Sequence, residues 1–311
     1  LCFIVFSLCT LLIIYAGVRN GIERVSKIMM PILIVLSVII AVYSVTRPGA
    51  LAGVKYFLVP NVKNFSWMTV VSAMGQMFYS LSIAMGILIT FGSYMKKDTA
   101  IEDSTRNVEI FDTGIAIMAG LMIIPAVFAF SGGDPDTLQA GPSLMFITIP
   151  KVFQNMGFGT VIGIVFFLLV LFAAVTSSIA LTESAVSTFE DELGWGRKKA
   201  TVLVGVIMLA LGSLSSLGYG PLAGIKIIGM QFLDLFDFLT NSVMMPIAAL
   251  LTSLFVSRVV GIDKIEAEII HGESAFRRKK VFVVMIKYLC PVFAIIILLS
   301  SVANALGWIK M

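Results

Sequence analysis

The segment from Trp67 to Met95 constrains the fold most, because it is apolar enough to enter a membrane yet long and interrupted in its middle. Ser80, Ser82 and Gly86 break up the apolar residues. As one continuous helix the segment would be about 43 Å long at about 1.5 Å per residue, whereas the hydrocarbon core of a bilayer is about 30 Å thick. The segment must therefore tilt, kink or unwind.

Two conformations fit this pattern. In the first, the helix stays continuous and the hydroxyls of Ser80 and Ser82 bond back to carbonyls one turn earlier, as serine does in membrane helices. In the second, the helix is discontinuous, and its freed carbonyls and half-helix ends line a binding cavity at mid-membrane. The segment alone leaves both conformations open.

The composition predicts a polytopic membrane protein. Of the 311 residues, 59% are hydrophobic and 13% are charged, and the mean hydropathy is +1.02, so a soluble fold could not bury the apolar surface. The net charge is +4, but the basic residues lie in short loops between apolar segments. This distribution is typical of a signal for membrane orientation and not of nucleic-acid binding. The three cysteines lie in apolar segments and the sole histidine, His271, lies in a polar loop, so neither a metal site of these residues nor a cysteine nucleophile is expected.

Eight apolar segments are long enough to span a bilayer as helices. They lie near residues 1–17, 28–46, 67–95, 110–130, 157–189, 200–217, 232–257 and 281–309. The fifth is expected to leave the bilayer as a helix that continues through Glu190. Lysine and arginine concentrate in the loops after the first, third, fifth and seventh segments, which the positive-inside rule places in the cytoplasm, with both ends of the chain outside. The chain begins inside an apolar run without an initiator methionine, so we expect that it is truncated at its start.

Two loops are expected to have structure of their own. Residues 262–274 mix acidic residues with isoleucines and are expected to form a cytoplasmic surface helix. Residues 131–156 open with turn-forming residues and become apolar between Pro142 and Pro150. A loop this apolar cannot lie in water, so we expect it to fold back onto the outer face like a lid.

Polar side chains inside the apolar segments need partners, because a central carboxylate costs roughly 2.5 to 3.5 kcal/mol on insertion scales. Asp112 has no lysine or arginine within one turn. It is either an interfacial residue in contact with headgroup water or a ligand for a hard cation that prefers oxygen donors. In the fifth segment, small residues would allow close helix packing. Thr176 and Ser177, with Glu183 less than two turns later, could also supply hydroxyl oxygens to a sodium ion.

Two residues in the seventh segment indicate its shape. Asp237 is expected to open the helix, where a carboxylate can cap the N-terminus. Pro246 would kink the same segment one to two turns deeper, as in transporter helices that face a cavity.

Six stretches taken together match a known family. They read GVRNGIERVSKIMMPIL, GQMFYSLSIAMG, SYMKKD, GPSLMFITIP, AAVTSSIALTESAVSTFEDELGWGRKKA and LFDFLTNSVMMP. In order and spacing they resemble the neurotransmitter:sodium symporter family, particularly its bacterial amino-acid transporters. The likeness covers nearly the whole chain from Gly17 onward.

The resemblance implies an all-α membrane protein, a polytopic helical bundle with the inverted-repeat transporter fold of the bacterial leucine-transporter type. Eight of the expected eleven spans would be present, corresponding to the family's fourth to eleventh helices. Residues 1–66 would form the last two helices of an incomplete first repeat and an external loop. Residues 67–261 would form a complete second five-helix repeat, and residues 262–311 a cytoplasmic surface helix and a final peripheral helix. The family's first helix, which supplies much of both sodium sites and holds the substrate carboxylate, would be missing.

The resemblance also implies two sodium sites made of oxygen ligands. One would take ligands from Ser80 and Asp112. The other would take the carbonyl of Ala173 and the hydroxyls of Thr176 and Ser177. Asp112 stands where many relatives have asparagine, so it adds a fixed negative charge beside the sodium ion. Chloride-dependent relatives use the anion for that charge, and we therefore expect that chloride is not required.

A substrate pocket and two gates are implied as well. The residues expected to line the pocket are Tyr79, Ser82, Met85, Ser177 and Leu181. The residues expected at the gates are Asp237 on the outer side and Tyr94 with Asp191 on the inner side, with their arginine partners in the family's N-terminal segment. Ala84 replaces a glycine that is common at the helix break, so the unwinding would be less free. Met85 replaces an aromatic residue, which indicates a more deformable pocket and a bulky apolar substrate.

These features predict sodium-coupled symport of an amino acid or a related small amine by alternating access, in a multi-pass protein of the inner (plasma) membrane. Sodium would favour the outward-facing state and thereby raise the substrate affinity. An ion channel is one alternative, although the polar residues cluster at one depth and no selectivity-filter sequence occurs. A non-transporting substrate sensor on the same fold is another. An enzyme is not expected, because neither an HExxH nor a GxSxG motif occurs.

Overall fold

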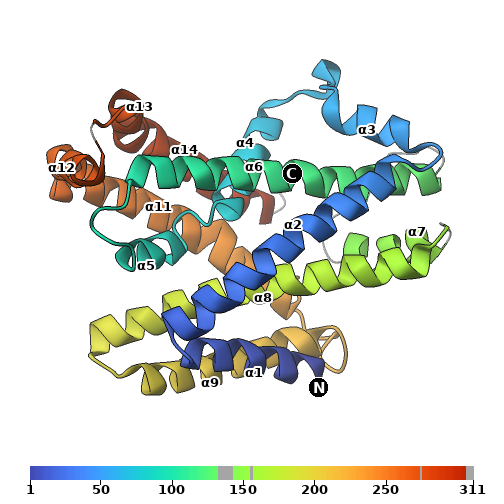
Figure 1. Ribbon diagram of the computed structural model, residues 1–311, viewed down its shortest axis with the longest axis horizontal. Helices are drawn as coiled ribbons and strands as arrows, with labels where there is room; N and C mark the ends of the chain where they lie inside the picture. Colours follow the sequence, from blue (N-terminus) through green and yellow to red (C-terminus); the bar gives the residue numbers. More distant parts are fainter. Residues whose placement is uncertain (132–142, 155–156, 274, 306–311) are drawn as a thin grey trace. The chain divides into compact units, whose positions relative to one another are not determined.

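The computed structural model describes residues 1–131, 143–154, 157–273 and 275–305, and the regular elements within these ranges are helices (Figure 1). The helices group into two compact units. The first unit consists of Leu1–Tyr15, Ser66–Glu109 and Ile179–Met311, and the second of Ala16–Phe65 and Ile110–Ser178. The bounds of the two units differ from the repeat boundaries expected from the resemblance, which stay a prediction.

The elements follow one another along the chain with short connections. Here α marks α-helices and η marks short 3₁₀ or π-helical segments. In order they are α1 (Cys2–Tyr15), η1 (Val18–Glu23), α2 (Arg24–Val45), α3 (Ala50–Leu58), η2 (Val62–Asn64), α4 (Trp67–Ser80), α5 (Ile87–Ser93), α6 (Ile101–Ser131), η4 (Leu144–Thr148), α7 (Ile149–Gln154), α8 (Gly159–Leu193), α9 (Arg197–Gly218), α10 (Phe232–Asp237), η5 (Phe238–Met244), α11 (Met245–Leu254), η6 (Phe255–Val260), α12 (Ile262–Gly272), α13 (Lys279–Val284), η7 (Met285–Leu289) and α14 (Cys290–Ala305).

Six helices within the described ranges are long and apolar enough to cross a membrane. They are Val18–Val45, Ile101–Ser131, Gly159–Leu193, Arg197–Leu217, Phe232–Val260 and Lys279–Ala305. Their most apolar windows are only 11 to 28% buried, so leucine, isoleucine and valine side chains cover their outer faces. Such surfaces require lipid contact, which confirms the prediction of a polytopic helical membrane protein. The other two expected spans are the shorter helix α1 and the segment 67–95, which is divided into α4 and α5.

Two further expectations about helices are confirmed. Helix α8 runs without interruption from Gly159 to Leu193 and so continues through Glu190. The surface helix expected after the seventh span is α12, whose last residue is Gly272. Ser274 lies outside the described residues.

Glu273, which follows α12, forms hydrogen bonds with the first turn of α6. The carboxylate of Glu273 accepts hydrogen bonds from the backbone N–H groups of Glu102 at 2.6 Å and Asp103 at 3.4 Å. These N–H groups lie in the first turn of a helix and have no carbonyl partner within it, so Glu273 caps α6 from outside. Arg278 donates to the carboxylate of Glu109 at 2.9 Å, and this hydrogen bond holds the pKa of Arg278 above its ordinary value.

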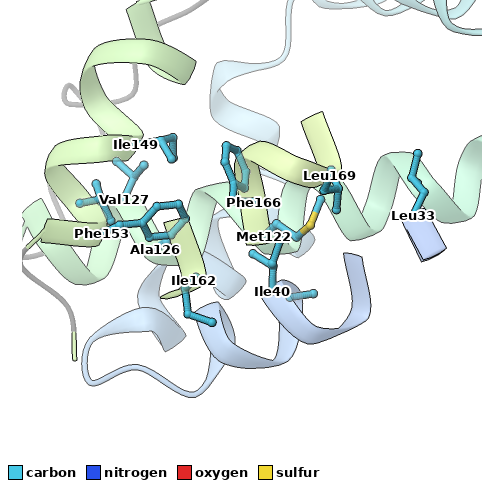
Figure 2. Close-up of a cluster of buried hydrophobic side chains, with 12 residues drawn as sticks. Leu33, Ile40, Met122, Ala126, Val127, Ile149, Phe153, Ile162, Phe166 and Leu169 are labelled. Carbon is cyan, nitrogen blue, oxygen red and sulfur yellow. The ribbon is translucent and has the colours of Figure 1, made fainter. Parts of the chain in front are cut away.

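The core of the second unit is formed by α2, α6, α7 and α8 (Figure 2). The ring of Phe166 is fully buried and meets the ring of Phe153 edge to face, with 5.4 Å between centroids. The Ser44 hydroxyl donates to the Met122 carbonyl at 2.7 Å, which satisfies a buried polar group where α2 meets α6. Dense aromatic and aliphatic packing thus fixes these helices within their unit.

The apolar part of the external loop belongs to this core. Ile149, Val152 and Phe153 of α7 are buried against it, so the expectation that the apolar part folds back onto the helices is confirmed for α7. Phe146 and Ile147 of η4 remain exposed. The closing role of the loop stays a prediction, and residues 132–142 and 155–156 lie outside the described residues.

In the first unit, α1 lies along α9 (Figure 1). A Cβ atom on Gly205 of α9 would lie 2.9 Å from the side chain of Leu11, and one on Gly212 would lie 2.4 Å from that of Phe3. Glycine at these two positions therefore allows the helices to approach closely. Helices α4, α11 and α14 also pack together, through the buried side chains of Phe78, Met245, Ala249, Ala294 and Ile297.

Candidate functional site

The broken segment between α4 and α5 organises the site. Helix α4 begins with a capping box, in which the side chains of Ser66 and Thr69 each accept a hydrogen bond from the other's backbone N–H, and it ends at Ser80. Residues 81–86 are not helical, and α5 begins only at Ile87. The discontinuous conformation is therefore confirmed, and the alternative of a continuous helix is wrong.

The break is made by residues in the left-handed region of backbone space. The φ angles are +53° at Ser82, +63° at Ala84 and +77° at Gly86. Only the glycine adopts this region without strain, and each of the other two costs about 1 to 2 kcal/mol. Ala84 thus unwinds despite its side chain, so the unwinding does not require the glycine that the family often has there.

The break leaves backbone acceptors without helical partners. Among the described residues, no backbone N–H donates to the carbonyls of Leu81, Ser82, Ile83 or Ala84. Carbonyl oxygens in this state can bind a cation or a polar ligand group, because the hydrocarbon region offers no water to replace the lost hydrogen bonds. The sequence prediction of available carbonyls at this place is therefore confirmed.

Helix α5 is attached to α8 at both ends and in its middle. The Ser184 hydroxyl donates to the Met85 carbonyl at 3.4 Å, just before α5 begins. The hydroxyls of Thr90 and Ser187 lie 3.2 Å apart. A Cβ atom on Gly86 would lie 2.6 Å from the Ser184 oxygen, so glycine is required there by space as well as by its φ angle.

A cavity of ≈ 490 Å³ lies beside the break within the first unit. Three of the residues expected in the substrate pocket line it, namely Tyr79, Met85 and Leu181, together with Ala84. Its other wall comes from the end of η5 and the start of α11, with the lining residues Thr240, Asn241, Met244, Met245 and Ala248. The volume is typical of a small-molecule site.

Two of the expected pocket residues are placed differently. Ser82 lies in the break but is not among the residues that line the cavity. Ser177 is an exposed residue of α8 that belongs to the second unit. The second wall was missed by sequence reasoning, and the only signal for it was the kink expected at Pro246.

A fully buried carboxylate lies on α8, two residues after the cavity-lining Leu181. Glu183 has no exposed surface and accepts two hydrogen bonds from Arg197, at 2.6 Å and 3.0 Å. The Arg197 Nε also donates to the carbonyl of Ile14 at 2.9 Å, and a second carboxylate, that of Glu190, lies 3.4 Å from the guanidinium. Two parallel N–H···O bonds to one carboxylate make a strong and directional ion pair. Sequence reasoning noted Glu183 but missed its partner, although Arg197 is the first basic residue that follows it.

Of the two residues expected at the inner gate, one joins this ion pair. The hydroxyl of Tyr94, just after α5, donates to the Glu183 carboxylate at 2.7 Å. Asp191 is exposed on α8, a little more than two turns after Glu183, and takes part in none of the ion pairs between described residues. The gating role of both residues stays a prediction.

The expected outer-gate residue lies beside the cavity's second wall. Asp237 is the last residue of α10, so the alternative that it caps a helix N-terminus is wrong; the first turn of α10 contains Asp234 instead. The Asp237 carboxylate is exposed and accepts a hydrogen bond from the Asn241 amide at 2.6 Å. Beyond it the chain forms the π-helical segment η5, because Pro246 has no N–H and cannot complete the regular ladder.

The expected sodium ligands lie in both units. Ser80, at the end of α4, belongs to the first unit, and Asp112, half-buried on α6, belongs to the second. Each is described within its own unit, so their sharing of one site stays a prediction. Among the described residues, no three His, Cys, Asp or Glu side chains form a cluster that could hold a metal ion.

The second set of expected ligands lies on α8 within the second unit. The Thr176 hydroxyl donates to the carbonyls of Ala173 at 2.9 Å and Phe172 at 3.1 Å, and Ser177 follows it. Oxygen ligands of one hard cation, at about 2.3 to 2.6 Å from the ion, lie roughly 3 Å apart. In this structure the Thr176 hydroxyl thus bonds back to its own helix, and the second sodium site stays a prediction.

Comparison with known proteins places these features in a family context. A family model described as the Sodium:neurotransmitter symporter family matches residues 1–308. The chain is 34% identical over 300 residues to the uncharacterized sodium-dependent transporter YhdH of Bacillus subtilis (strain 168), which covers 96% of this chain and 66% of the relative. It is 30% identical over 300 residues to an uncharacterized sodium-dependent transporter of Haemophilus influenzae, covering 96% and 64%, respectively. It is 31% identical over 264 residues to the uncharacterized sodium-dependent transporter MJ1319 of Methanocaldococcus jannaschii, covering 83% and 52%.

A solved structure shows the same fold. The crystal structure of MhsT in complex with L-phenylalanine matches with a TM-score of 0.82 and 35% sequence identity, covering 96% of this chain and 66% of that one. The chain thus spans less than two thirds of the length of the relatives it matches.

Proposed function

Because this chain belongs to the sodium:neurotransmitter symporter family, we propose that the protein is a secondary active transporter that couples inward sodium movement to the uptake of an amino acid or a related small amine. Transport would occur across the plasma membrane by alternating access around a central site. The family is one of sodium-dependent transporters and not of enzymes. The observation that carries the proposal is the cavity beside a broken membrane helix, whose lining includes Tyr79 at the end of α4 and Met85 within the break.

The cavity favours a substrate with a bulky and largely apolar side chain. Met85, Leu181, Met244 and Met245 supply most of the apolar wall. Methionine side chains are flexible and polarisable, so they adapt to ligands of different shape. The related protein MhsT was crystallised with L-phenylalanine, and we extend that ligand class to this protein.

The sodium ions would be bound by oxygen atoms at the break and on α6 and α8. Asp112 would supply a fixed negative charge, which lowers the cost of placing a cation in the membrane. The carbonyl of Ala173 and the hydroxyls of Thr176 and Ser177 would bind a second ion, and Ser80 would contribute to the first. Sodium binding then raises substrate affinity by favouring the same conformational state.

Uptake into proteoliposomes tests this function. The reconstituted protein should accumulate radiolabelled L-phenylalanine or another apolar amino acid when an inward sodium gradient is imposed, and uptake should saturate. Uptake that needs no gradient and does not saturate would indicate the channel alternative. Sodium-dependent binding without any accumulation would indicate the sensor alternative.

Two ion dependences follow from the role given to Asp112. Asp112→Ala should abolish the sodium dependence of amino-acid binding, and binding that keeps this dependence would remove Asp112 from the sodium site. Replacing chloride by gluconate should leave uptake unchanged, since the carboxylate already supplies the negative charge. A strict requirement for chloride would contradict this role.

A further inference from the structure

The cavity carries a polar group that its apolar wall does not explain. Three lining side chains can form hydrogen bonds, those of Tyr79, Thr240 and Asn241. The Thr240 hydroxyl donates to the carbonyl of Phe236 at 2.7 Å within its own helix and has a second carbonyl, that of Asp237, at 3.4 Å. Its proton is therefore used within its own helix, and Thr240 has no donor to offer to a ligand.

Asn241 is oriented by its neighbour. Its amide nitrogen donates to the Asp237 carboxylate at 2.6 Å, and an ionised carboxylate can only accept hydrogen bonds. This fixes the amide with its nitrogen toward Asp237 and leaves the carbonyl oxygen as the free end. Within the described part of the chain, no hydrogen bond ends on that oxygen.

An acceptor in a mostly apolar cavity favours a ligand that brings a donor. If the ligand has none, the amide oxygen loses water on binding and gains no hydrogen bond in return, which lowers affinity. The surrounding Met85, Met244 and Met245 suit a flat ring, since sulfur makes favourable contacts with aromatic groups. The cavity of ≈ 490 Å³ has room for an amino acid with a two-ring side chain.

We infer that Asn241, positioned by Asp237, selects substrates whose aromatic side chain ends in an N–H or O–H donor, such as an indole or a phenol, over those with a plain phenyl ring. This inference rests on the proposed function and adds a specificity-determining residue to it. The side-chain donor of the substrate bonds to the Asn241 oxygen, while the substrate's charged groups bind elsewhere. The net value of one neutral hydrogen bond corresponds to about fivefold to tenfold in affinity.

Competition binding on the full chain tests the inference. L-tryptophan, L-tyrosine and L-phenylalanine would each compete with radiolabelled L-phenylalanine at saturating sodium. The unsubstituted protein should bind L-tryptophan or L-tyrosine about fivefold to tenfold more tightly than L-phenylalanine. Asn241→Leu should bring these ratios to one or below, mainly by weakening the donor-bearing ligands. Asp237→Ala releases the amide to rotate and should lower the ratios partway.

A matched control removes an amide at another place. Asn107→Leu changes an exposed residue of α6 outside the cavity and should leave the ratios unchanged. Equal affinities for all three amino acids in the unsubstituted protein would overturn the inference without any variant having to fold. Loss of affinity for all three by the same factor in Asn241→Leu would also overturn it, because Asn241 would then contact a group common to every amino acid. Absence of sodium-dependent binding of any amino acid would instead overturn the proposed function together with the inference.

Discussion

The buried ion pair on α8 yields the sharpest prediction about stability. Glu183 is fully buried, and it receives two hydrogen bonds from Arg197 and one from Tyr94. Arg197→Met keeps the apolar stem of the side chain but leaves the carboxylate with Tyr94 alone. Breaking a buried pair in this way costs about 3 to 5 kcal/mol. The Arg197 side chain keeps 23% of its exposure, so we expect the lower end, about 3 kcal/mol, or roughly a 150-fold change in the ratio of folded to unfolded protein.

The size of the effect depends on which partner is removed. Glu183→Gln leaves the charge on Arg197, which still reaches solvent and Glu190, so about 1 to 2 kcal/mol is expected. Tyr94→Phe removes one hydrogen bond and should cost about 1 kcal/mol. Replacing both Glu183 and Arg197 by methionine should return the stability to within about 1 kcal/mol of the original, because apolar groups of similar volume substitute well for a buried pair.

Denaturation with SDS in mixed micelles, followed by circular dichroism, measures these differences as free energies of unfolding. The single variants Arg197→Met and Glu183→Met and the variant that carries both substitutions form a cycle whose coupling energy should exceed about 2 kcal/mol. An Arg197→Met protein within about 0.5 kcal/mol of the original would refute the reasoning. A double variant whose loss equals the sum of the two single losses would refute it equally, because the pair would then not act as a unit.

Two further predictions concern the first residues of helices α5 and α6. Gly86→Ala places a side chain at a left-handed φ and against Ser184, so it should lower the free energy of unfolding by more than about 2 kcal/mol in the same assay. Adding Ser184→Gly should remove only the steric clash, so that a loss of about 1 to 2 kcal/mol remains from the strained φ angle. Glu273→Ala should uncap α6 and speed hydrogen exchange of the Glu102 and Asp103 amides by about fivefold, corresponding to about 1 kcal/mol, whereas unchanged exchange would show that Glu273 does not cap the helix.

Much of the fold can be predicted from the sequence, because apolar length and the positions of charged loops are local properties. Apolar runs and basic loops are enough to expect the long helices, the continuation of α8 and the surface helix α12. The break in the third span could also be anticipated, since Ser80, Ser82 and Gly86 weaken a segment that is too long to cross the bilayer straight. The π-helical segments could be placed less well. The kink expected at Pro246 corresponds to η5, which ends two residues before it, whereas no sequence feature had marked the others.

The candidate site was predicted in part, and its missing parts share one cause. Tyr79, Met85 and Leu181 could be assigned because they stand in recognisable motifs, and in the structure all three line one cavity. Asn241 and Arg197 could not, because their roles arise from contacts across helices. A carboxylate inside a membrane span is expected to have a positively charged partner, but the sequence does not show which of several loops supplies the basic side chain.

The attachment of α5 to α8 also determines where the cavity can change shape. Helix α5 is fastened along its length to one neighbour, whereas α4 is packed with α11 and α14. When α5 moves relative to α4, the backbone torsion angles of residues 81–86 must therefore change, and among these residues Ser82 and Ala84 already have strained φ angles. Relaxing either residue would release about 1 to 2 kcal/mol. Occupancy of the cavity and backbone strain at its edge are thus thermodynamically linked, and a ligand that fits only the strained geometry must bind tightly enough to maintain it.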